Sequence, residues 1–464
     1  MRPRTYRVVT LGCKLNQFDS ASIEGLLRAR GFREAKGEDP AGVYVVNTCT
    51  VTENADREAR RLARRARREN PGCRLLVTGC SVELDREGLA RDPGIDAVVG
   101  HSDRERIPAI LDRIAAESDP ATLGEIACIE EAEETAAAGP LHYGDRTRAF
   151  LKVQEGCDLS CAYCIIPQVR GASRSIAPDL LERAALALTA RGYREIVLTG
   201  VNTGDYGKDL TPRTTLAALL QRLLRTPGLG RLRLNSLEPR TVTLEVVDLL
   251  AGEAGLARHL QIPLQSGCDA TLKRMYRNYR TADYLETLER LRARVPDIGL
   301  GADVIVGFPG ESAAEFEETY RFIAASPLNY VHVFSYSDRP GTPASRLPGP
   351  VSATDIRDRS ARLRTLGEEI GLAFRRGFVG RILEVLPFVR RRPDGRLRAL
   401  SGNFIEVALD GDPSLVQRLV PVRIDRVDGA DTEASLLPLA YEQMRIAPEI
   451  GNSMPEPHRD FAIH

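Results

Sequence analysis

The segment GCDLSCAYCIIP places three of the chain's nine cysteines, Cys157, Cys161 and Cys164, within eight residues. Closely spaced thiolates in a reduced protein indicate a metal site, and purely structural zinc and iron–sulfur sites usually have four protein ligands. Three thiolates on a four-iron cluster leave one iron open, which is typical of a site that carries out a reaction. A zinc site with a fourth ligand from elsewhere is the alternative, although none of the six histidines stands at a zinc-like spacing from these cysteines.

A second set of cysteines, Cys13, Cys49 and Cys80, follows three apolar runs with the composition of strands, YRVVTLG, GVYVVNT and RLLVTG. In a parallel sheet the carboxyl ends of the strands share one edge, so these residues are expected to converge. They would then form a second three-thiolate cluster site, with three small buried side chains as the alternative. Cys73 precedes its strand, so we expect it at the opposite edge and not among the ligands.

The elements that must position these cysteines follow an α/β pattern. Apolar runs alternate with amphipathic helical segments at the start of the chain, which predicts a parallel-sheet α/β domain. Six further strand and helix repeats predict a complete or partial (βα)6 barrel with its active site in the loops after the strands, and short alternating strands near the C-terminus predict a small antiparallel β-barrel. The expected divisions are residues 1–125 for the first domain, 126–147 for a linker, 148–352 for the barrel, 353–376 for a helical connector, 377–440 for the small barrel and 441–464 for a loose tail.

The composition is that of an ordinary globular protein. Hydrophobic residues make up 43% of the 464 residues and charged residues 28%, and 64 basic residues balance 64 acidic ones, so net charge gives no sign of a nucleic-acid partner. The sequence has no export signal and no apolar run long enough for a membrane span. These features predict a cytoplasmic protein with no membrane partner, whose cysteines stay reduced.

The spacing and residues of CDLSCAYC resemble the signature of radical S-adenosylmethionine (SAM) enzymes. In that family the open iron of a [4Fe-4S] cluster chelates SAM, and reductive cleavage yields a 5′-deoxyadenosyl radical that abstracts hydrogen from the substrate. By this resemblance Tyr163 lies near the adenine of SAM, with a core aromatic as the alternative, and polar loops after successive strands hold the rest, although Glu238 could instead cap a helix. The implied SAM contacts are Tyr163, Thr199, Gly200, Asn202, Ser236, Glu238 and Gln265, with Gly307 and Pro309 in a later loop.

Two such cysteine sets in this order resemble the methylthiotransferases, and the resemblance covers nearly all of the chain. That family combines an N-terminal domain holding an auxiliary cluster, a central radical SAM domain and a small RNA-binding β-barrel called TRAM. The resemblance therefore implies two [4Fe-4S] clusters and SAM as cofactors, with no side-chain acid or base in the reaction. Ser81 and Cys268 depart from the usual residues but are not ligands. The motifs that carry the resemblance are TLGCKLNQFDS, VVNTCTVTENAD, VTGC, GCDLSCAYCIIP, LQIPLQSGCDATLKRMYRNY, DVIVGFPGE and VFSYSDRPGTPA.

The helix expected after Cys49 carries seven arginines with only Glu58 and Glu69 nearby. Its spacing places most of the arginines on one face and several small apolar residues, such as Ala59 and Ala63, on the other, which can pack on the sheet. A solvated helix face is the alternative, but guanidinium groups suit phosphate. The predicted RNA contacts are Arg57, Arg60, Arg61, Arg64, Arg65 and Arg68 on this helix and Arg390, Arg391 and Arg392 in the small barrel.

Three substrates compete within the family: threonylcarbamoyladenosine in tRNA, isopentenyladenosine in tRNA and an aspartate of a ribosomal protein. GCKLNQFDS and NTCTVTENADREAR resemble the threonylcarbamoyl type, which implies a methylthio group added to adenine C2 of N6-threonylcarbamoyladenosine at position 37. The implied partners are a tRNA anticodon stem-loop, an electron donor such as flavodoxin or ferredoxin, and a sulfur source, with no DNA. A non-enzymatic, zinc-stabilised RNA-binding protein is the alternative from a different class.

Overall fold

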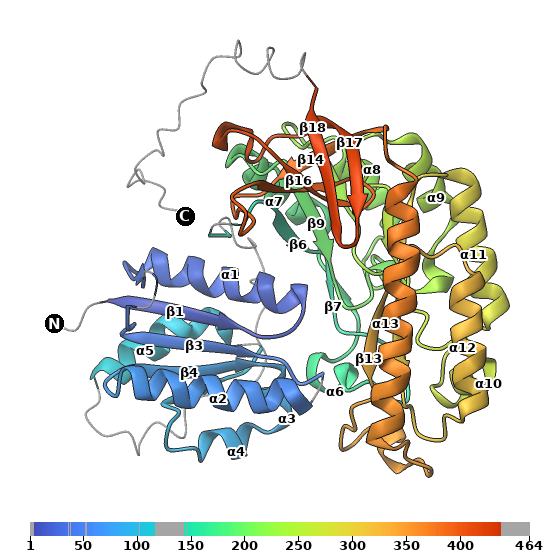
Figure 1. The fold of residues 1–464 in the computed structure, drawn as a ribbon. Helices are drawn as coiled ribbons and strands as arrows, with labels where there is room; N and C mark the ends of the chain where they lie inside the picture. Colours follow the sequence, from blue (N-terminus) through green and yellow to red (C-terminus); the bar gives the residue numbers. More distant parts are fainter. Residues whose placement is uncertain are drawn as a thin grey trace.

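The computed structural model describes residues 4–437, except residues 36, 38, 52, 102, 117–142 and 145. Cys128, most of the expected linker and the expected tail lie outside the described residues. Three parts follow one another along the chain, with the blue N-terminal sheet beside a central set of strands and the red C-terminal barrel above both (Figure 1). No helix in the described part of the chain is long and apolar enough to cross a bilayer.

The N-terminal part is a five-stranded parallel sheet in the order β2-β1-β3-β4-β5. Every residue of β3 is buried, as expected for a central strand covered on both faces. Helices α1 and α5 pack on one face through residues such as Leu27 and Leu111, and α2 and α4 pack on the other through Ala63 and Leu89. The elements are β1 Thr5–Thr10, α1 Lys14–Ala29, β2 Arg33–Glu34, β3 Val43–Thr48, α2 Glu53–Glu69, β4 Arg74–Gly79, α3 Cys80–Leu84, α4 Arg86–Ala90, β5 Ala97–Val99, η1 Arg104–Arg106 and α5 Ile107–Ala116.

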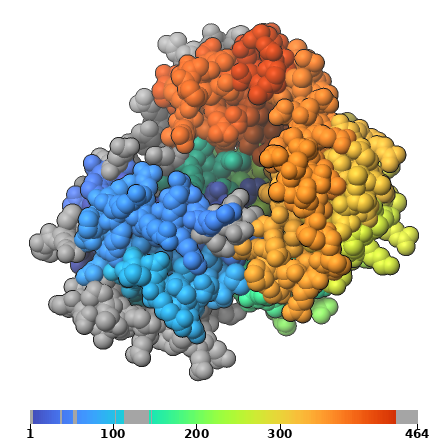
Figure 2. All heavy atoms as spheres, turned by 60° about the horizontal axis from the view of Figure 1, so that its bottom comes forward, coloured from blue at the N-terminus to red at the C-terminus, as the bar shows by residue number. Residues whose placement is uncertain are grey.

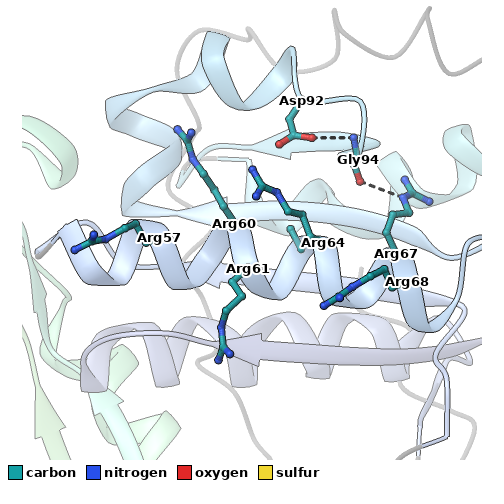
Figure 3. A pocket seen from close by; sticks show the side chains of 9 residues that line it. Arg57, Arg60, Arg61, Arg64, Arg67, Arg68, Asp92 and Gly94 are labelled. Atoms are coloured by element: carbon teal, nitrogen blue, oxygen red, sulfur yellow. Dashed lines mark hydrogen bonds between the residues drawn. The ribbon is translucent and has the colours of Figure 1, made fainter.

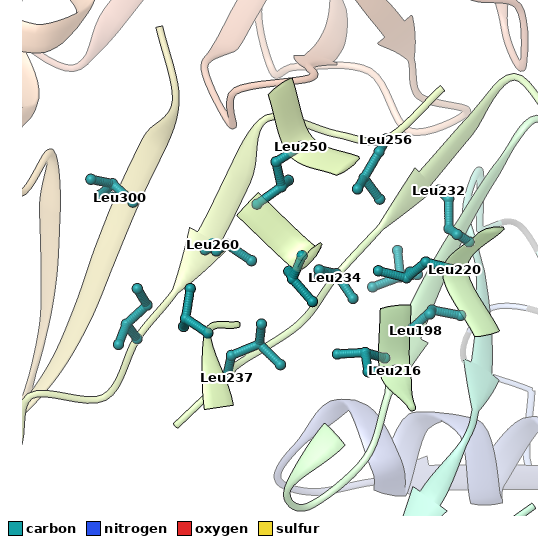
Figure 4. Close-up of a cluster of buried hydrophobic side chains, with 14 of the residues drawn as sticks. Leu198, Leu216, Leu220, Leu232, Leu234, Leu237, Leu250, Leu256, Leu260 and Leu300 are labelled. Atoms are coloured by element: carbon teal, nitrogen blue, oxygen red, sulfur yellow. The ribbon is translucent and has the colours of Figure 1, made fainter. Parts of the chain in front are cut away.

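The central part has six parallel strands in two sheets, β10-β9-β6 and β11-β12-β13, which isolated bridges such as Ser236 to Gln261 join. The outer strands β6 and β13 do not pair, so the predicted barrel is confirmed in its partial form. Leucines from the strands and covering helices fill its core (Figure 4). The elements are β6 Ala149–Lys152, β7 Gln154–Glu155, α6 Ile166–Arg170, β8 Arg174–Ser175, α7 Pro178–Ala190, β9 Glu195–Thr199, η3 Thr203–Asp205, α8 Leu216–Leu223, β10 Arg231–Arg233, η4 Pro239–Thr241, α9 Leu244–Gly252, β11 His259–Gln261, α10 Asp269–Arg274, α11 Thr281–Arg294, β12 Gly299–Val306, α12 Ala313–Ala325, β13 Tyr330–Ser335 and η5 Pro343–Arg346.

The long helix α13 leads into a closed β-barrel in the order β14-β15-β16-β18-β17. The barrel encloses its own apolar core, which includes Val385, Val407 and Val422. The predicted small antiparallel barrel is therefore confirmed, with one parallel pair between β16 and β18. The elements are α13 Ala353–Arg376, β14 Ile382–Pro387, β15 Leu397–Ser401, β16 Glu406–Leu409, η6 Pro413–Leu415, β17 Val420–Asp428 and β18 Asp431–Leu436.

The C-terminal barrel covers the end of the central part at which its strands begin. Buried Glu195 at the start of β9 binds Arg233 (2.8 Å) and Arg231 (3.1 Å), and both arginines also donate to carbonyl oxygens of the C-terminal barrel. The His259 ring stacks on Phe404 with centroids 4.2 Å apart. The opposite end, where the strands finish and the cysteine loop lies, is left for the N-terminal part and for ligands.

Candidate functional site

The loop with Cys157, Cys161 and Cys164 follows β7 at the strand-end side of the central part. Gly156 begins the loop at a φ of +74°, and a Cβ there would lie 1.9 Å from the carbonyl oxygen of Ala172, so only glycine fits. The amide of Ala162 donates to the Met275 carbonyl (2.9 Å), which fixes the loop against the segment after α10. The three thiols are therefore held by the local backbone.

Charged side chains surround this loop. The guanidinium of Arg277 donates to the Cys161 sulfur (2.9 Å) and also forms an ion pair with Glu238. Burial raises the pKa of the Cys157 thiol to about 11 and that of Cys164 to about 12. Because metals bind thiolates, loading of this site must release protons, and the nearby guanidinium stabilises the negative sulfur.

The second set of cysteines converges at one edge of the N-terminal sheet. Cys13 precedes α1, Cys49 follows β3 and Cys80 begins α3, after the neighbouring strands β1, β3 and β4. A Cβ on Gly12 would lie 2.7 Å from the Cys49 sulfur, which shows how closely the first two loops approach. Cys73 precedes β4 and is buried at the other end of that strand, where we expected it.

The two cysteine sets adjoin each other across α6, the helix that begins two residues after Cys164. Cys80 packs in a buried apolar cluster with Ile165 and Val169. Arg170, the last residue of α6, donates to Asn16 Oδ1 (2.7 Å) near the start of α1.

The same guanidinium binds Asp19 (3.3 Å) in the N-terminal part and Glu155 (2.5 Å) in the central part. Sequence reasoning missed this bridge, because nothing in the run IIPQVR shows which carboxylates the arginine meets. The arginine follows the cysteine motif closely, and that position is the one signal the sequence offers.

The described residues contain no group of three or more Cys, His, Asp or Glu side chains close enough to ligate one metal ion. Each thiolate of a four-iron cluster binds a different iron, so cluster ligands need not meet at one point. Beside the second set, Asn47 Oδ1 and Thr78 Oγ1 are buried without a hydrogen bond to the described protein. Three thiols and these two polar atoms at one edge of the N-terminal sheet fit a bound iron–sulfur cluster.

The residues expected to contact SAM follow strand ends on the same side of the barrel. Thr199 ends β9, Gly200 and Asn202 follow it, and Ser236 and Glu238 follow β10. Thr199 Oγ1 and Asn202 Oδ1 are buried, with no hydrogen-bond partner among the described residues. Unpaired buried polar atoms are costly, so this pair of atoms fits a polar ligand such as SAM.

Three other expected SAM contacts take distinct positions. Gln265 adopts a left-handed φ of +64° while its backbone is held between Asp303 and Ile305, a strained conformation of the kind found at binding sites. Tyr163 packs in an apolar cluster with residues that include Met275, so both of its interpretations stay open. Glu238 stands at the N-cap position of η4, but its side chain makes no cap hydrogen bond and binds Arg277 instead.

The arginine-rich helix α2 lines a surface cavity of about 700 Å³ (Figure 3). Its small residues, including Ala63 and Ala66, are buried against the sheet as the spacing predicts. Arg64 and Arg68 are exposed, with no hydrogen bond or ion pair to the described residues. Arg67 instead turns inward to Asp96 (2.5 Å), which makes it a structural residue.

Carboxylates and carbonyls occupy several of the other predicted RNA contacts. Arg61 and Arg65 pair with Glu58 and Glu69, both at 2.6 Å, within α2 itself. In the C-terminal barrel, Arg392 pairs with Asp394 and Asp431, and Arg391 donates to the carbonyls of Gly395 and Gly411. Arg57, Arg60 and Arg390 are exposed at their expected positions, and Arg60 also pairs with Asp85 (3.5 Å).

Two family models match the chain: the Radical SAM superfamily over residues 151–323 and the Uncharacterized protein family UPF0004 over residues 5–100. Threonylcarbamoyladenosine tRNA methylthiotransferase MtaB of Bacillus subtilis (strain 168) is 36% identical over 418 residues, which cover 89% of this chain and 92% of that protein. The chain belongs to the radical SAM methylthiotransferase family. A tRNA-2-methylthio-N(6)-dimethylallyladenosine synthase of Acidothermus cellulolyticus is 37% identical over 83% of this chain and 78% of its own.

Among solved structures, the cobalamin- and [4Fe-4S]-bound radical SAM methyltransferase TsrM from Kitasatospora setae shares the fold. Its TM-score is 0.54 at 16% identity, over 74% of this chain and 77% of that one. As a radical SAM methylthiotransferase the protein is an enzyme that uses SAM and a [4Fe-4S] cluster. The non-enzymatic zinc-protein alternative therefore fails, and each cysteine set lies inside one of the two matched family regions.

Proposed function

We propose that the protein adds a methylthio group to adenine C2 of N6-threonylcarbamoyladenosine at position 37 of tRNA. The observation that carries this proposal is the meeting of two three-cysteine sets across α6, one in a local loop and one at a sheet edge. Methylthio transfer needs one site that activates a carbon and a neighbouring site that supplies the sulfur-containing group, and the two adjoining cysteine sets can provide them. The Bacillus subtilis relative named for threonylcarbamoyladenosine matches over most of its length, which supports the substrate.

In this proposal Cys157, Cys161 and Cys164 hold the SAM-binding [4Fe-4S] cluster. Cys13, Cys49 and Cys80 hold a second [4Fe-4S] cluster. Bound SAM supplies the radical chemistry that removes hydrogen from the target carbon. The protein's own share is to position groups: Arg277 donates to the Cys161 sulfur, and the unpaired oxygens of Thr199 and Asn202 offer acceptors to SAM.

Gly200, Ser236, Glu238, Gln265 and Tyr163 complete the proposed SAM site from neighbouring loops. Their positions after successive strands surround the mouth of the partial barrel. The left-handed backbone at Gln265 turns its loop at this mouth.

The proposed partner is a tRNA anticodon stem-loop. Figure 2 shows a hollow bounded by the blue N-terminal part, by orange α13 and by the C-terminal barrel, with the green central part at its floor. The exposed arginines of α2 add positive charge on the N-terminal side. The reaction also requires an electron donor such as flavodoxin or ferredoxin, and a sulfur source.

Mass spectrometry of tRNA nucleosides from cells that lack the gene tests the substrate. The methylthio derivative of threonylcarbamoyladenosine should disappear and return when the gene is restored. Loss of the isopentenyl counterpart instead would assign the other tRNA substrate. Anaerobic iron and sulfide analysis of the purified protein tests the cofactors, with about eight irons per chain expected for two clusters.

A further inference from the structure

Lys14 carries a half-buried ammonium group from the N-terminal part to the central part. It is the first residue of α1, directly after Cys13, and its Nζ donates to Asn235 Oδ1 at the end of β10. No described carboxylate lies within ion-pair distance of it. Buried cations are normally paired with an anion, so a neutral amide as the hydrogen-bond partner leaves the charge of Lys14 uncompensated.

The groups that face Lys14 make an anion more favourable there. Arg148 and Arg233 lie near enough to repel the positive charge of Lys14. The one carboxylate of buried Glu195 pairs with both of these arginines. Apart from Glu195, Asp303 is the one described carboxylate that acts on the charge of Lys14.

Other groups already occupy Asp303: the Gln261 amide donates to it at 2.5 Å, and the His332 ring lies 3.3 Å away. Of the cations in this group, Lys14 is therefore the one that lacks a carboxylate of its own.

Lys14 also adjoins residues of both proposed cofactor sites. Cys13 precedes it in the second cysteine set, and its partner Asn235 directly precedes Ser236 of the proposed SAM loops. The ammonium thus joins the segment that holds the second cysteine set to the loop after β10 that holds a proposed SAM contact. A target base bound at this junction would have its N6 substituent near the ammonium.

We propose that Lys14, held by Asn235, binds a carboxylate on the N6 substituent of the target adenosine. A threonylcarbamoyl substituent carries a carboxylate and an isopentenyl substituent carries none, so Lys14 would select between these two substrates. This inference rests on the proposed function. Charge-assisted hydrogen bonds are strong enough that the selection should reach about tenfold or more in affinity.

Binding of short anticodon stem-loop RNAs to the cluster-loaded protein tests this. One RNA carries N6-threonylcarbamoyladenosine, and a second carries the analogue whose threonine carboxylate is replaced by a carboxamide. The unaltered protein should bind the carboxylate RNA about tenfold more tightly, and Lys14→Met should bind both RNAs with the weaker affinity. Lys273→Met, which removes an exposed lysine charge on α10, should keep the preference.

Because Lys14 adjoins a proposed cluster ligand, iron content is measured for each variant. Asn235→Asp provides a second variant away from the cysteines, and its carboxylate should occupy the ammonium and abolish the preference while the iron stays bound. Equal affinity of the unaltered protein for both RNAs, or a preference kept in Lys14→Met or Asn235→Asp, overturns the inference. These results do not depend on methylthio transfer, whereas the nucleoside analysis of gene-deficient cells tests the proposed function itself.

Discussion

The two cysteine sets reach the same composition by different routes. Cys157, Cys161 and Cys164 lie within eight residues on one loop, whereas 35 and 30 residues separate Cys13, Cys49 and Cys80 along the chain. The first set needs only a correct loop, and the second needs three neighbouring strands in parallel register. The loop set should therefore survive local disturbance of the sheet, and the sheet-edge set should not.

Removal of one ligand from each set should give the largest effect and separate the two sites. Cys161→Ala should lose about four of about eight irons and all SAM cleavage. Cys49→Ala should lose the same amount of iron but keep SAM cleavage, because its set lies on a different element. Anaerobic iron analysis and chromatography of 5′-deoxyadenosine measure both results, and SAM cleavage by Cys161→Ala would contradict the assignment of the loop.

Loss of Arg170 should uncouple the two sets. Arg170→Met removes a buried guanidinium from Asp19 and Glu155, although Arg104 (2.7 Å) still binds Asp19 and Lys152 (3.0 Å) still binds Glu155. Because these cations remain, the loss should lower the free energy of unfolding by more than about 1 kcal/mol but by less than the ~3–5 kcal/mol expected for a buried carboxylate left without any partner. Chemical denaturation measures the change.

Arg222→Met provides the matched control for Arg170. It removes a more exposed guanidinium that pairs with Asp179 and Glu182. Its cost should stay within about 1 kcal/mol. An equal cost for the two arginine variants would show that α6 does not join the two parts.

A single methyl group at Gly79 should disturb the sheet-edge set alone. Gly79 has a φ of +104°, and a Cβ there would lie 2.3 Å from the Thr48 carbonyl oxygen, beside Cys49 and Cys80. Gly79→Ala should cost more than about 1 kcal/mol and reduce the iron of the sheet-edge set while SAM cleavage persists. Gly252→Ala is the control, since no atom lies within 4 Å of its added Cβ, and it should leave iron content unchanged.

The two sets also differ in how much of each could be predicted from sequence. The spacing of Cys157, Cys161 and Cys164 alone predicted the loop set. The sheet-edge set could be predicted because each of its cysteines comes after a strand-like run, such as VYVVNT before Cys49. The contacts of Arg170, Arg277 and Lys14 could not be predicted, because each joins segments brought together by packing and no periodicity marks them. Arg67 shows the same limit: it belongs to the arginine run by sequence but turns inward, because Asp96 lies beneath it.

Alkaline pH should destabilise the cluster-free protein through the loop set. The unfolded chain loses its cysteine protons near the ordinary pKa of about 8.5. The folded loop keeps the pKa of Cys157 at about 11 and that of Cys164 at about 12. A raised folded pKa stabilises the protein below the unfolded value, and this contribution is lost as the pH rises toward the folded value.

The melting temperature of the cluster-free protein should therefore fall as the pH rises above about 8.5. Cys164→Ala should show a shallower fall, because it removes one of the two thiols. Thermal melts between neutral and alkaline pH measure both slopes. Identical slopes for the two proteins would mean that burial of the Cys164 thiol has no influence on stability.

The smallest effect is expected on the outer surface of α2, the helix that follows Cys49 and so belongs with the sheet-edge set. Combined charge reversal at Arg60, Arg64 and Arg68 should weaken tRNA binding and reduce its salt dependence by about one unit of slope for each phosphate that the protein no longer neutralises. Fluorescence anisotropy at several salt concentrations measures both quantities.

Reversal at Arg61 and Arg65 is the matched control for this surface, because Glu58 and Glu69 hold those charges at 2.6 Å, more closely than Asp85 holds Arg60 (3.5 Å). It should change the salt slope less than reversal of the three outward arginines. Iron content should stay full in both variants, since no cysteine is touched. If charge reversal at Arg60, Arg64 and Arg68 left the salt dependence of tRNA binding unchanged, the outer surface of α2 would only be a solvated helix face. The N-terminal part would then hold the sheet-edge set without using α2 to bind the RNA.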